Sequence, residues 1–129
     1  MFSVYYNPKR ERFEYRKGNY EGTLEFAIRQ LRFGSVRFYV SDDKWFDLEL
    51  TNENISSAML MKPQFLPPRG GLLFFFLKSN EYNDSFFELD GKRYTTVIEI
   101  PKKIYSSWAD DIEKIMKELD LKFTPPILW

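Results

Sequence analysis

The sequence predicts an α+β fold, with antiparallel sheets of six to seven strands and two helices, the longer helix near the C-terminus. Several short segments alternate apolar and polar residues, which is typical of strands that bury one face. Residues 23–31 and 107–119 instead repeat apolar residues at helical spacing. A Pro- and Gly-rich loop at 63–71 separates two groups of strands. We therefore expect a single domain over 1–129, with this loop as the candidate boundary between two sheet–helix halves.

The first half of the chain predicts two hairpins. Residues 2–6 and 12–17 alternate on either side of an Asn-Pro turn signal, and their outer side is charged and mostly basic. Residues 36–40 and 46–50 alternate more clearly and form the second hairpin. One face of that hairpin is apolar, and the other carries Arg37, Tyr39, Trp45, Asp47 and Glu49.

Capping signals place the two helices. The first is expected over 23–31, because a Thr can cap its start and Gly34 follows its end. The second is expected to start at Ser106 or Ser107, and Asp110 completes a pattern like a capping box. The apolar stripe of this second helix consists of Trp108, Ile112, Ile115, Met116 and Leu119.

The second half of the chain predicts further strands. Residues 72–77 are apolar on both sides, which suits a central strand covered on both faces. Residues 86–89 and 92–100 flank an Asp-Gly pair, which is the strongest short hairpin signal in the chain. Residues 55–61 are apolar, and their pattern leaves helix and strand open.

The composition excludes most catalytic chemistry. The 129 residues include no Cys and no His, so thiolate nucleophiles, Cys-type zinc sites and His general bases are excluded. The sequence has no Gly-rich phosphate-binding motif. We therefore expect no enzyme activity and no cofactor. Because carboxylates suit Mg²⁺ or Mn²⁺, a carboxylate–metal nuclease is the enzyme alternative, although the acidic residues of one hairpin are interpreted as solvated: Asp42, Asp43, Asp47 and Glu49.

The charge and the hydropathy of the chain limit the kinds of partner that it can bind. Lys+Arg and Asp+Glu number 19 each, which argues against a partner that needs a basic whole surface, such as duplex DNA. The charges lie in bands, with basic residues in excess over 1–40 and 61–80 and acidic residues in excess over 41–60 and 81–100. The longest apolar run, 72–77, is far shorter than the ~20 residues that span a bilayer. With no secretory signal pattern at the N-terminus, we expect a cytoplasmic protein.

The aromatic content is the most unusual feature. Thirteen Phe, eight Tyr and three Trp exceed what one small core easily buries, so some should lie at the surface. Basic and aromatic residues interleave over 9–20, a combination that single-strand binders use for phosphates and bases. Alternatively, the aromatics serve as strand formers and the charges protect an edge hairpin. The candidate nucleic-acid-binding residues are Arg10, Arg12, Tyr15, Arg16, Tyr20, Arg37, Tyr39 and Trp45.

The last third of the chain resembles a known family. Val97 to Pro101, Trp108 to Leu119 and Pro125 to Trp129 follow one another as a strand ending at Pro, a helix with an early Trp and an apolar tail. This order resembles the end of the Whirly single-stranded-DNA-binding domain, and the helix resembles that of the related positive-cofactor-four family. The basic Lys-Gly-Lys-type strand motif of plant Whirly proteins is absent here. The resemblance implies two four-stranded sheets with a helix each, self-association through the helices, and single strands bound along the sheets.

Two functions stay open at this point. One is a non-catalytic single-stranded nucleic-acid-binding protein, with no preference for DNA or RNA indicated. The other is a small virus- or plasmid-encoded protein-interaction or inhibitor module, which the balanced charge and missing catalytic residues favour. In both we expect a homodimer, because the second helix and the apolar tail offer more hydrophobic surface than a lone helix needs. The candidate interface residues are Trp108, Ile112, Ile115, Met116, Leu119, Ile127, Leu128 and Trp129.

Overall fold

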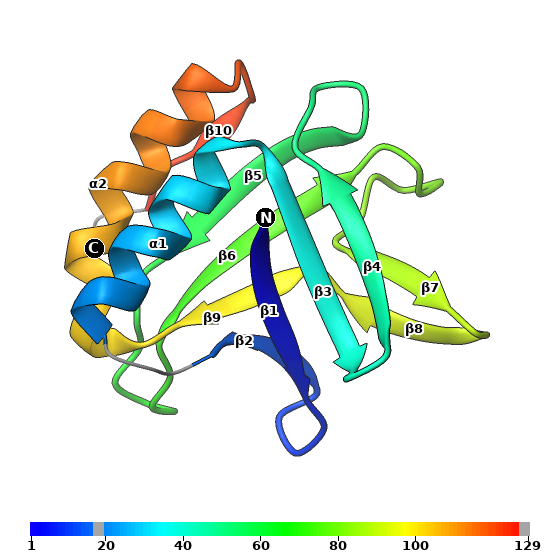
Figure 1. Ribbon diagram of the computed structural model, residues 1–129, viewed down its shortest axis with the longest axis horizontal. Helices are drawn as coiled ribbons and strands as arrows, with labels where there is room; N and C mark the ends of the chain where they lie inside the picture. Colours follow the sequence, from blue (N-terminus) through cyan, green and yellow to red (C-terminus); the bar gives the residue numbers. More distant parts are fainter. Residues whose placement is uncertain (17–19, 127–129) are drawn as a thin grey trace.

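Residues 1–16 and 20–126 are described by the computed structural model (Figure 1). Its helices are α1 (Tyr20–Arg32) and α2 (Lys102–Glu118). Its strands are β1 (Phe2–Asn7), β2 (Arg12–Tyr15), β3 (Ser35–Ser41), β4 (Lys44–Glu49), β5 (Ile55–Met61), β6 (Gly71–Leu77), β7 (Phe86–Leu89), β8 (Lys92–Thr95), β9 (Val97–Ile100) and β10 (Phe123–Thr124). The α+β class and the longer helix near the C-terminus are confirmed.

The main sheet is mixed, so the prediction of antiparallel sheets with six to seven strands is wrong. Eight strands lie in the order β10-β5-β6-β9-β2-β1-β3-β4, and β7 pairs with β8 in a separate hairpin. Three neighbouring pairs are parallel: β1 with β3, β2 with β9, and β5 with β10. Alternation of apolar and polar residues identifies a strand but is the same in parallel and antiparallel pairs, so direction was not readable from the pattern.

The two helices and the β7–β8 hairpin cover the same face of the main sheet, which we call the inner face (Figure 1). At one end of this face, Trp108 of α2 packs with ring centroids 5.6 Å from Phe2 and 4.9 Å from Tyr15. At the other end, Phe87 of β7 lies 5.8 Å from both Phe13 and Phe38. The inner face is therefore apolar along the whole sheet, and the opposite, outer face is the surface left for function.

Both helices start earlier than expected. α1 begins at Tyr20 rather than 23, and it ends as predicted, with Gly34 at φ +77° donating its N–H to the Leu31 carbonyl. α2 begins at Lys102, directly after Pro101, with no side-chain cap, so the predicted Ser cap is wrong. Ile104 is buried and extends the apolar stripe one turn towards the N-terminus, which favours the earlier start.

The predicted strand 92–100 is divided between two sheets. β8 leaves the main sheet to pair with β7, whereas β9 lies between β6 and β2. Thr96 joins them and is buried, and its backbone N–H and hydroxyl donate to the carbonyls of Ser85 and Phe75. The Asp-Gly turn is confirmed, since Asp90 and Gly91 both have the positive φ that a tight hairpin requires. The ambiguous segment 55–61 forms β5.

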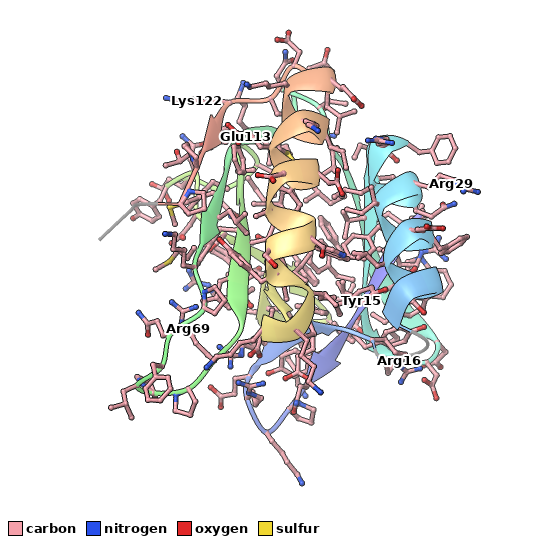
Figure 2. The ribbon with its side chains drawn as sticks, turned by 90° about the vertical axis from the view of Figure 1, so that its left-hand side faces the viewer. Tyr15, Arg16, Arg29, Arg69, Glu113 and Lys122 are labelled. Carbon is pink, nitrogen blue, oxygen red and sulfur yellow. The ribbon has the colours of Figure 1, made fainter. Side chains whose placement is uncertain are left out.

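The arrangement differs in one respect from what the Whirly-like resemblance implies. Instead of two four-stranded sheets, both groups of strands join edge to edge through the parallel pair β2–β9. The two helices then lie side by side on one face (Figure 2). Across residues 1–16 and 20–126, neither helix has both the length and the apolarity needed to cross a membrane.

Candidate nucleic-acid interface

Three aromatic side chains form a row across the outer face of β1, β3 and β4. Strand register places Tyr5 opposite Tyr39 and Tyr39 opposite Trp45. The rings of Tyr5 and Tyr39 stack at 4.7 Å with an interplanar angle of 6°, and those of Tyr39 and Trp45 lie 5.7 Å apart at 59°. Cross-strand neighbours on one face are close enough for such contacts, so the pairing itself assembles the row. We call these three residues the aromatic ladder.

Arg16 closes one end of the aromatic ladder. Its guanidinium carbon lies 3.9 Å from the centre of the Tyr5 ring, within the range of a cation–π contact. Arg16 is exposed, and no ion pair involves it within the described parts of the chain. A positive charge with no carboxylate partner therefore stands beside the stacked rings.

Arg37 closes the other end and is held by a carboxylate. Its Nε and Nη2 donate to Asp47 Oδ1 and Oδ2 at 2.8 and 3.1 Å, a bidentate pair between residues directly opposite in register. Its guanidinium carbon lies 4.5 Å from the centre of the Trp45 ring. The hydrogen bonds to Asp47 and to the Tyr39 hydroxyl raise the pKa of Arg37, so this side chain stays charged while its orientation is fixed.

A buried carboxylate holds the basic residues of β2 and of the turn before it. Glu99 on β9 is 7 % exposed, and its Oε1 accepts the Gly70 N–H at 2.9 Å. Its Oε2 lies 2.7 Å from Arg10 Nη1 and 3.0 Å from Arg12 Nη2. Arg10 also pairs with Glu14 at 2.9 Å. Glu99 therefore joins β9 to these arginines and to the loop before β6, and much of the arginines' charge is compensated.

The structure brings together most, but not all, of the predicted binding residues. Arg12, Arg16, Arg37, Tyr39 and Trp45 occupy the outer face, and Arg10 lies next to Arg12 at Glu99.

Tyr15 was predicted to bind nucleic acid, but it does not lie on the outer face. It is 5 % exposed on the inner face, packed on Trp108, because it alternates with Arg12 and Arg16 rather than sharing their side. Figure 2 shows it beside the helices. The side chain of Tyr20 lies outside the described residues.

Tyr5 is the ladder residue that the sequence analysis missed. It occupies the polar side of β1 together with Ser3 and Asn7, whereas Phe2 and Val4 point to the core. An aromatic residue on the polar side of a strand was the available signal. The stacking of Tyr5 on Tyr39 could not be predicted from the sequence, because it depends on the parallel pairing of β1 with β3.

Most of the residues predicted to form a dimer interface pack against the chain's own sheet instead. Leu119 is partly buried against the core, and residues 127–129 lie outside the described residues. Four of the candidates are 0 % exposed, because they are the side of α2 that packs on the chain's own sheet: Trp108, Ile112, Ile115 and Met116. As the chain is folded, these four cannot contact a second copy.

Three acidic residues of the hairpins are held in separate ion pairs or hydrogen bonds. Asp47 binds Arg37, Asp90 binds Lys44 Nζ at 2.8 Å, and Asp43 accepts from Ser41 at 2.9 Å. Hydrogen bonding to Asp90 raises the pKa of Lys44. Within 1–16 and 20–126, no three Asp or Glu side chains come together in a group that could hold a metal ion.

Comparisons of the chain with protein-family models, with curated proteins and with solved structures found no match. We therefore infer function from the chemistry of the outer face.

Proposed function

We propose that the chain is a non-catalytic protein that binds single-stranded nucleic acid on the outer face of β1, β3 and β4. The observation that carries the proposal is the aromatic ladder with an arginine at each end. Aromatic side chains stack on bases without reading sequence, and each stacked base contributes about 1–3 kcal/mol. Arginine adds contacts with phosphates and with base planes.

Within the aromatic ladder, the ring most open to a base is that of Trp45. It is 43 % exposed, whereas Tyr5 and Tyr39 are only partly exposed. Tyr5 has Arg16 and Tyr39 as its neighbours, so its role is to fix the position of Tyr39 and, through it, of Trp45. A base stacked on Trp45 would also lie next to the Arg37 guanidinium, whose orientation Asp47 fixes.

A single strand suits this surface better than a duplex. The chain has equal numbers of acidic and basic residues, and two of the nearby arginines are compensated by Glu99 and Glu14. Duplex DNA binds chiefly through many phosphate contacts, which this face does not offer. A single strand exposes its bases to stacking, so it can bind with few cations. We expect a shallow dependence of affinity on salt for the same reason.

The test is a fluorescence anisotropy titration of labelled oligothymidylate and oligouridylate, with a labelled duplex of equal length as comparison, at low and at moderate salt. Trp45→Ala should weaken binding of the single strands by about tenfold or more, since one stacked base is lost. Phe33→Ala is the control, because Phe33 is a more exposed aromatic residue in the turn after α1, away from the aromatic ladder, and its loss should leave affinity unchanged. Absence of binding at low salt, or an equal effect of both variants, would overturn the proposal.

A further inference from the structure

A second exposed apolar feature lies far from the aromatic ladder, on the loop between β5 and β6. Phe65 is 85 % and Leu66 82 % exposed. Backbone hydrogen bonds from Gln64 N to Arg69 O and from Arg69 N to Gln64 O, at 3.1 and 3.2 Å, close the loop at its base. Arg69 Nη1 also donates to the carbonyls of Lys62 and Gly70 at 3.2 and 2.8 Å. The two apolar side chains are therefore presented by a closed loop.

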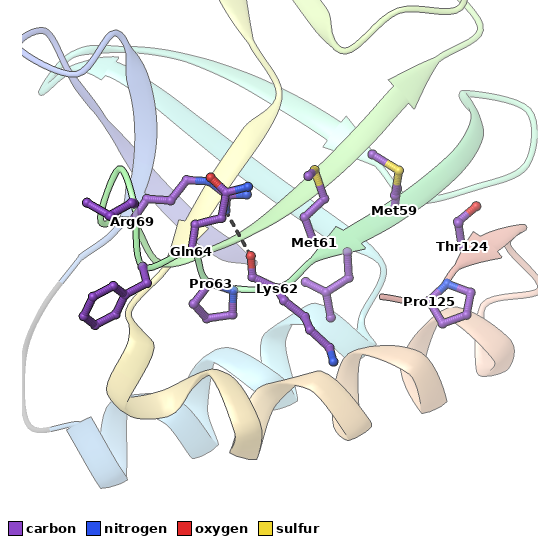
Figure 3. A pocket seen from close by; sticks show the side chains of 11 residues that line it. Met59, Met61, Lys62, Pro63, Gln64, Arg69, Thr124 and Pro125 are labelled. Carbon is purple, nitrogen blue, oxygen red and sulfur yellow. Dashed lines mark hydrogen bonds between the residues drawn. The ribbon is translucent and has the colours of Figure 1, made fainter. Parts of the chain in front are cut away.

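An open cleft of about 410 Å³ adjoins this loop (Figure 3). Met59 and Met61 of β5 line it, with Pro63 on the loop side and Pro125 on the side of β10. The volume falls in the range of known ligand sites, and methionines adapt their shape to varied apolar partners. Buried apolar anchors of this kind dominate the energetics of protein interfaces.

The β5 edge beside the cleft is only partly covered. β10 pairs with Ala58 and Met59, and its continuation is Pro125 and Pro126, which have no N–H to donate. Among the described residues, no strand is paired with β5 on this side beyond Met59. An extended partner segment therefore finds both apolar side chains and a strand edge in one place.

The charged groups that line the cleft are both basic. Lys62 and Arg69 are the ionisable residues that line it, and Lys102 Nζ lies 5.6 Å from the Phe65 ring. Arg69 is bonded to two carbonyls, and burial, followed by the charge of Arg12, lowers its pKa. Neither Lys62 nor Lys102 makes an ion pair within the described parts of the chain, so both charges are available to a partner.

We propose that the Phe65–Leu66 tip and the adjoining cleft bind an extended segment of another protein that carries large apolar side chains beside carboxylates. Charge complementarity selects this occupant, because carboxylates would meet Lys62 and Lys102 while apolar side chains fill the cleft. A second copy of the chain is disfavoured: a two-fold interface would bring this basic rim against itself. The site does not depend on the proposed nucleic-acid binding.

The experiment is selection of a random peptide library displayed on phage against the full chain, followed by titration of the enriched peptides as synthetic, labelled probes. We expect enriched sequences that combine large apolar residues with Asp or Glu. Phe65→Ser and Lys62→Glu should each weaken binding of those peptides by about tenfold or more. The matched controls are Tyr82→Ser, an equally exposed aromatic in another loop, and Lys92→Glu on β8, and both should change affinity less than about twofold.

Three results would overturn the proposal. The first is failure to enrich any peptide, or enrichment of peptides rich in Lys and Arg. The second is binding that Phe65→Ser and its control Tyr82→Ser affect equally. The third is evidence for a different occupant. If the chain sediments as a dimer that Phe65→Ser dissociates, the surface belongs to a second copy. If peptides bind only after the chain is shortened after Pro126, the surface belongs to the chain's own C-terminal residues.

Discussion

The outer face of the sheet has two halves of opposite chemistry. On β1 to β4, guanidinium groups contact aromatic rings and a carboxylate. Arg16 contacts the ring of Tyr5, and Arg37 contacts Asp47 and the ring of Trp45. We call this the polar–aromatic half. On β5 and β6, most of the outward side chains are apolar and only partly covered, with Ser57 opposite Phe76 as a polar exception. This apolar half consists of Met59, Met61, Leu72, Phe74 and Phe76.

The inner face shows no such division, since it is apolar from β5 to β4. Burial of that face stabilises the fold, and it leaves the outer face free to differ from one half to the other. Our two proposals assign different partners to these surfaces: single-stranded nucleic acid to the polar–aromatic half, and an apolar peptide segment to the surface near the apolar half. Glu99 lies at the seam, where β9 meets β2.

The largest effect is expected at this seam. Glu99→Ala removes the buried carboxylate that Gly70, Arg10 and Arg12 share, and of these three donors only Arg10 keeps another carboxylate, Glu14. We expect a loss of about 3 kcal/mol in the free energy of unfolding, measured by urea denaturation. Glu88→Ala on β7, which is exposed, should change it by less than about 0.5 kcal/mol. Equal stability of the two variants would show that the halves are held together without Glu99.

The second prediction separates the two halves by their ligands. Tyr39→Ser should weaken oligonucleotide binding by about tenfold, because it removes the middle ring of the aromatic ladder. Phe74→Ser, on the apolar half, should leave that affinity unchanged. Circular dichroism of both variants checks that they fold, and anisotropy titration measures the affinities. If Phe74→Ser weakens binding as much as Tyr39→Ser, the nucleic acid does not follow the aromatic ladder.

A smaller effect is expected from the charge on the polar–aromatic half. Asp47→Asn removes a negative charge and frees the Arg37 guanidinium, so oligonucleotide affinity should rise by about threefold. The slope of log affinity against log salt should steepen by up to about 0.7, as expected for one more phosphate contact with a single strand. Asp43→Asn changes the net charge equally but lies in the β3–β4 turn, and it should have the smaller effect. An equal gain in both would assign the change to net charge alone.

The smallest effect is expected at Tyr105, whose ring packs where β6 begins. Its hydroxyl is buried without a hydrogen-bond partner in the described part of the chain, and burial raises its pKa. The unfolded chain releases this proton near pH 10 and the folded chain releases it at higher pH. This group's contribution to stability is therefore fully present below pH 10 and is lost as pH rises through the folded pKa. Urea denaturation at pH 8 and above pH 10 should show a smaller alkaline loss for Tyr105→Phe than for the original chain, and an unchanged loss would contradict the prediction.

Much of the local structure was predictable from the residues. The alternation of 36–40 with 46–50 placed Arg37, Tyr39 and Trp45 on one face, and the register confirms it. The spacing from Trp108 to Leu119 predicted the longer helix, but it also suggested a dimer surface that the structure uses as core. A single apolar stripe cannot show whether its partner is the same chain or another, because both bury the same area.

By itself, the sequence determined the class of the fold, most of its strands and both helices, and the absence of Cys and His chemistry. Only the tertiary structure decided that β2 lies beside β9, that Tyr5 stacks on Tyr39, and that Glu99 binds arginines far away in the chain. Periodicity reports which side of a strand is buried, and it is set by neighbouring residues. Strand order and direction are set by contacts between distant segments, which no local pattern encodes.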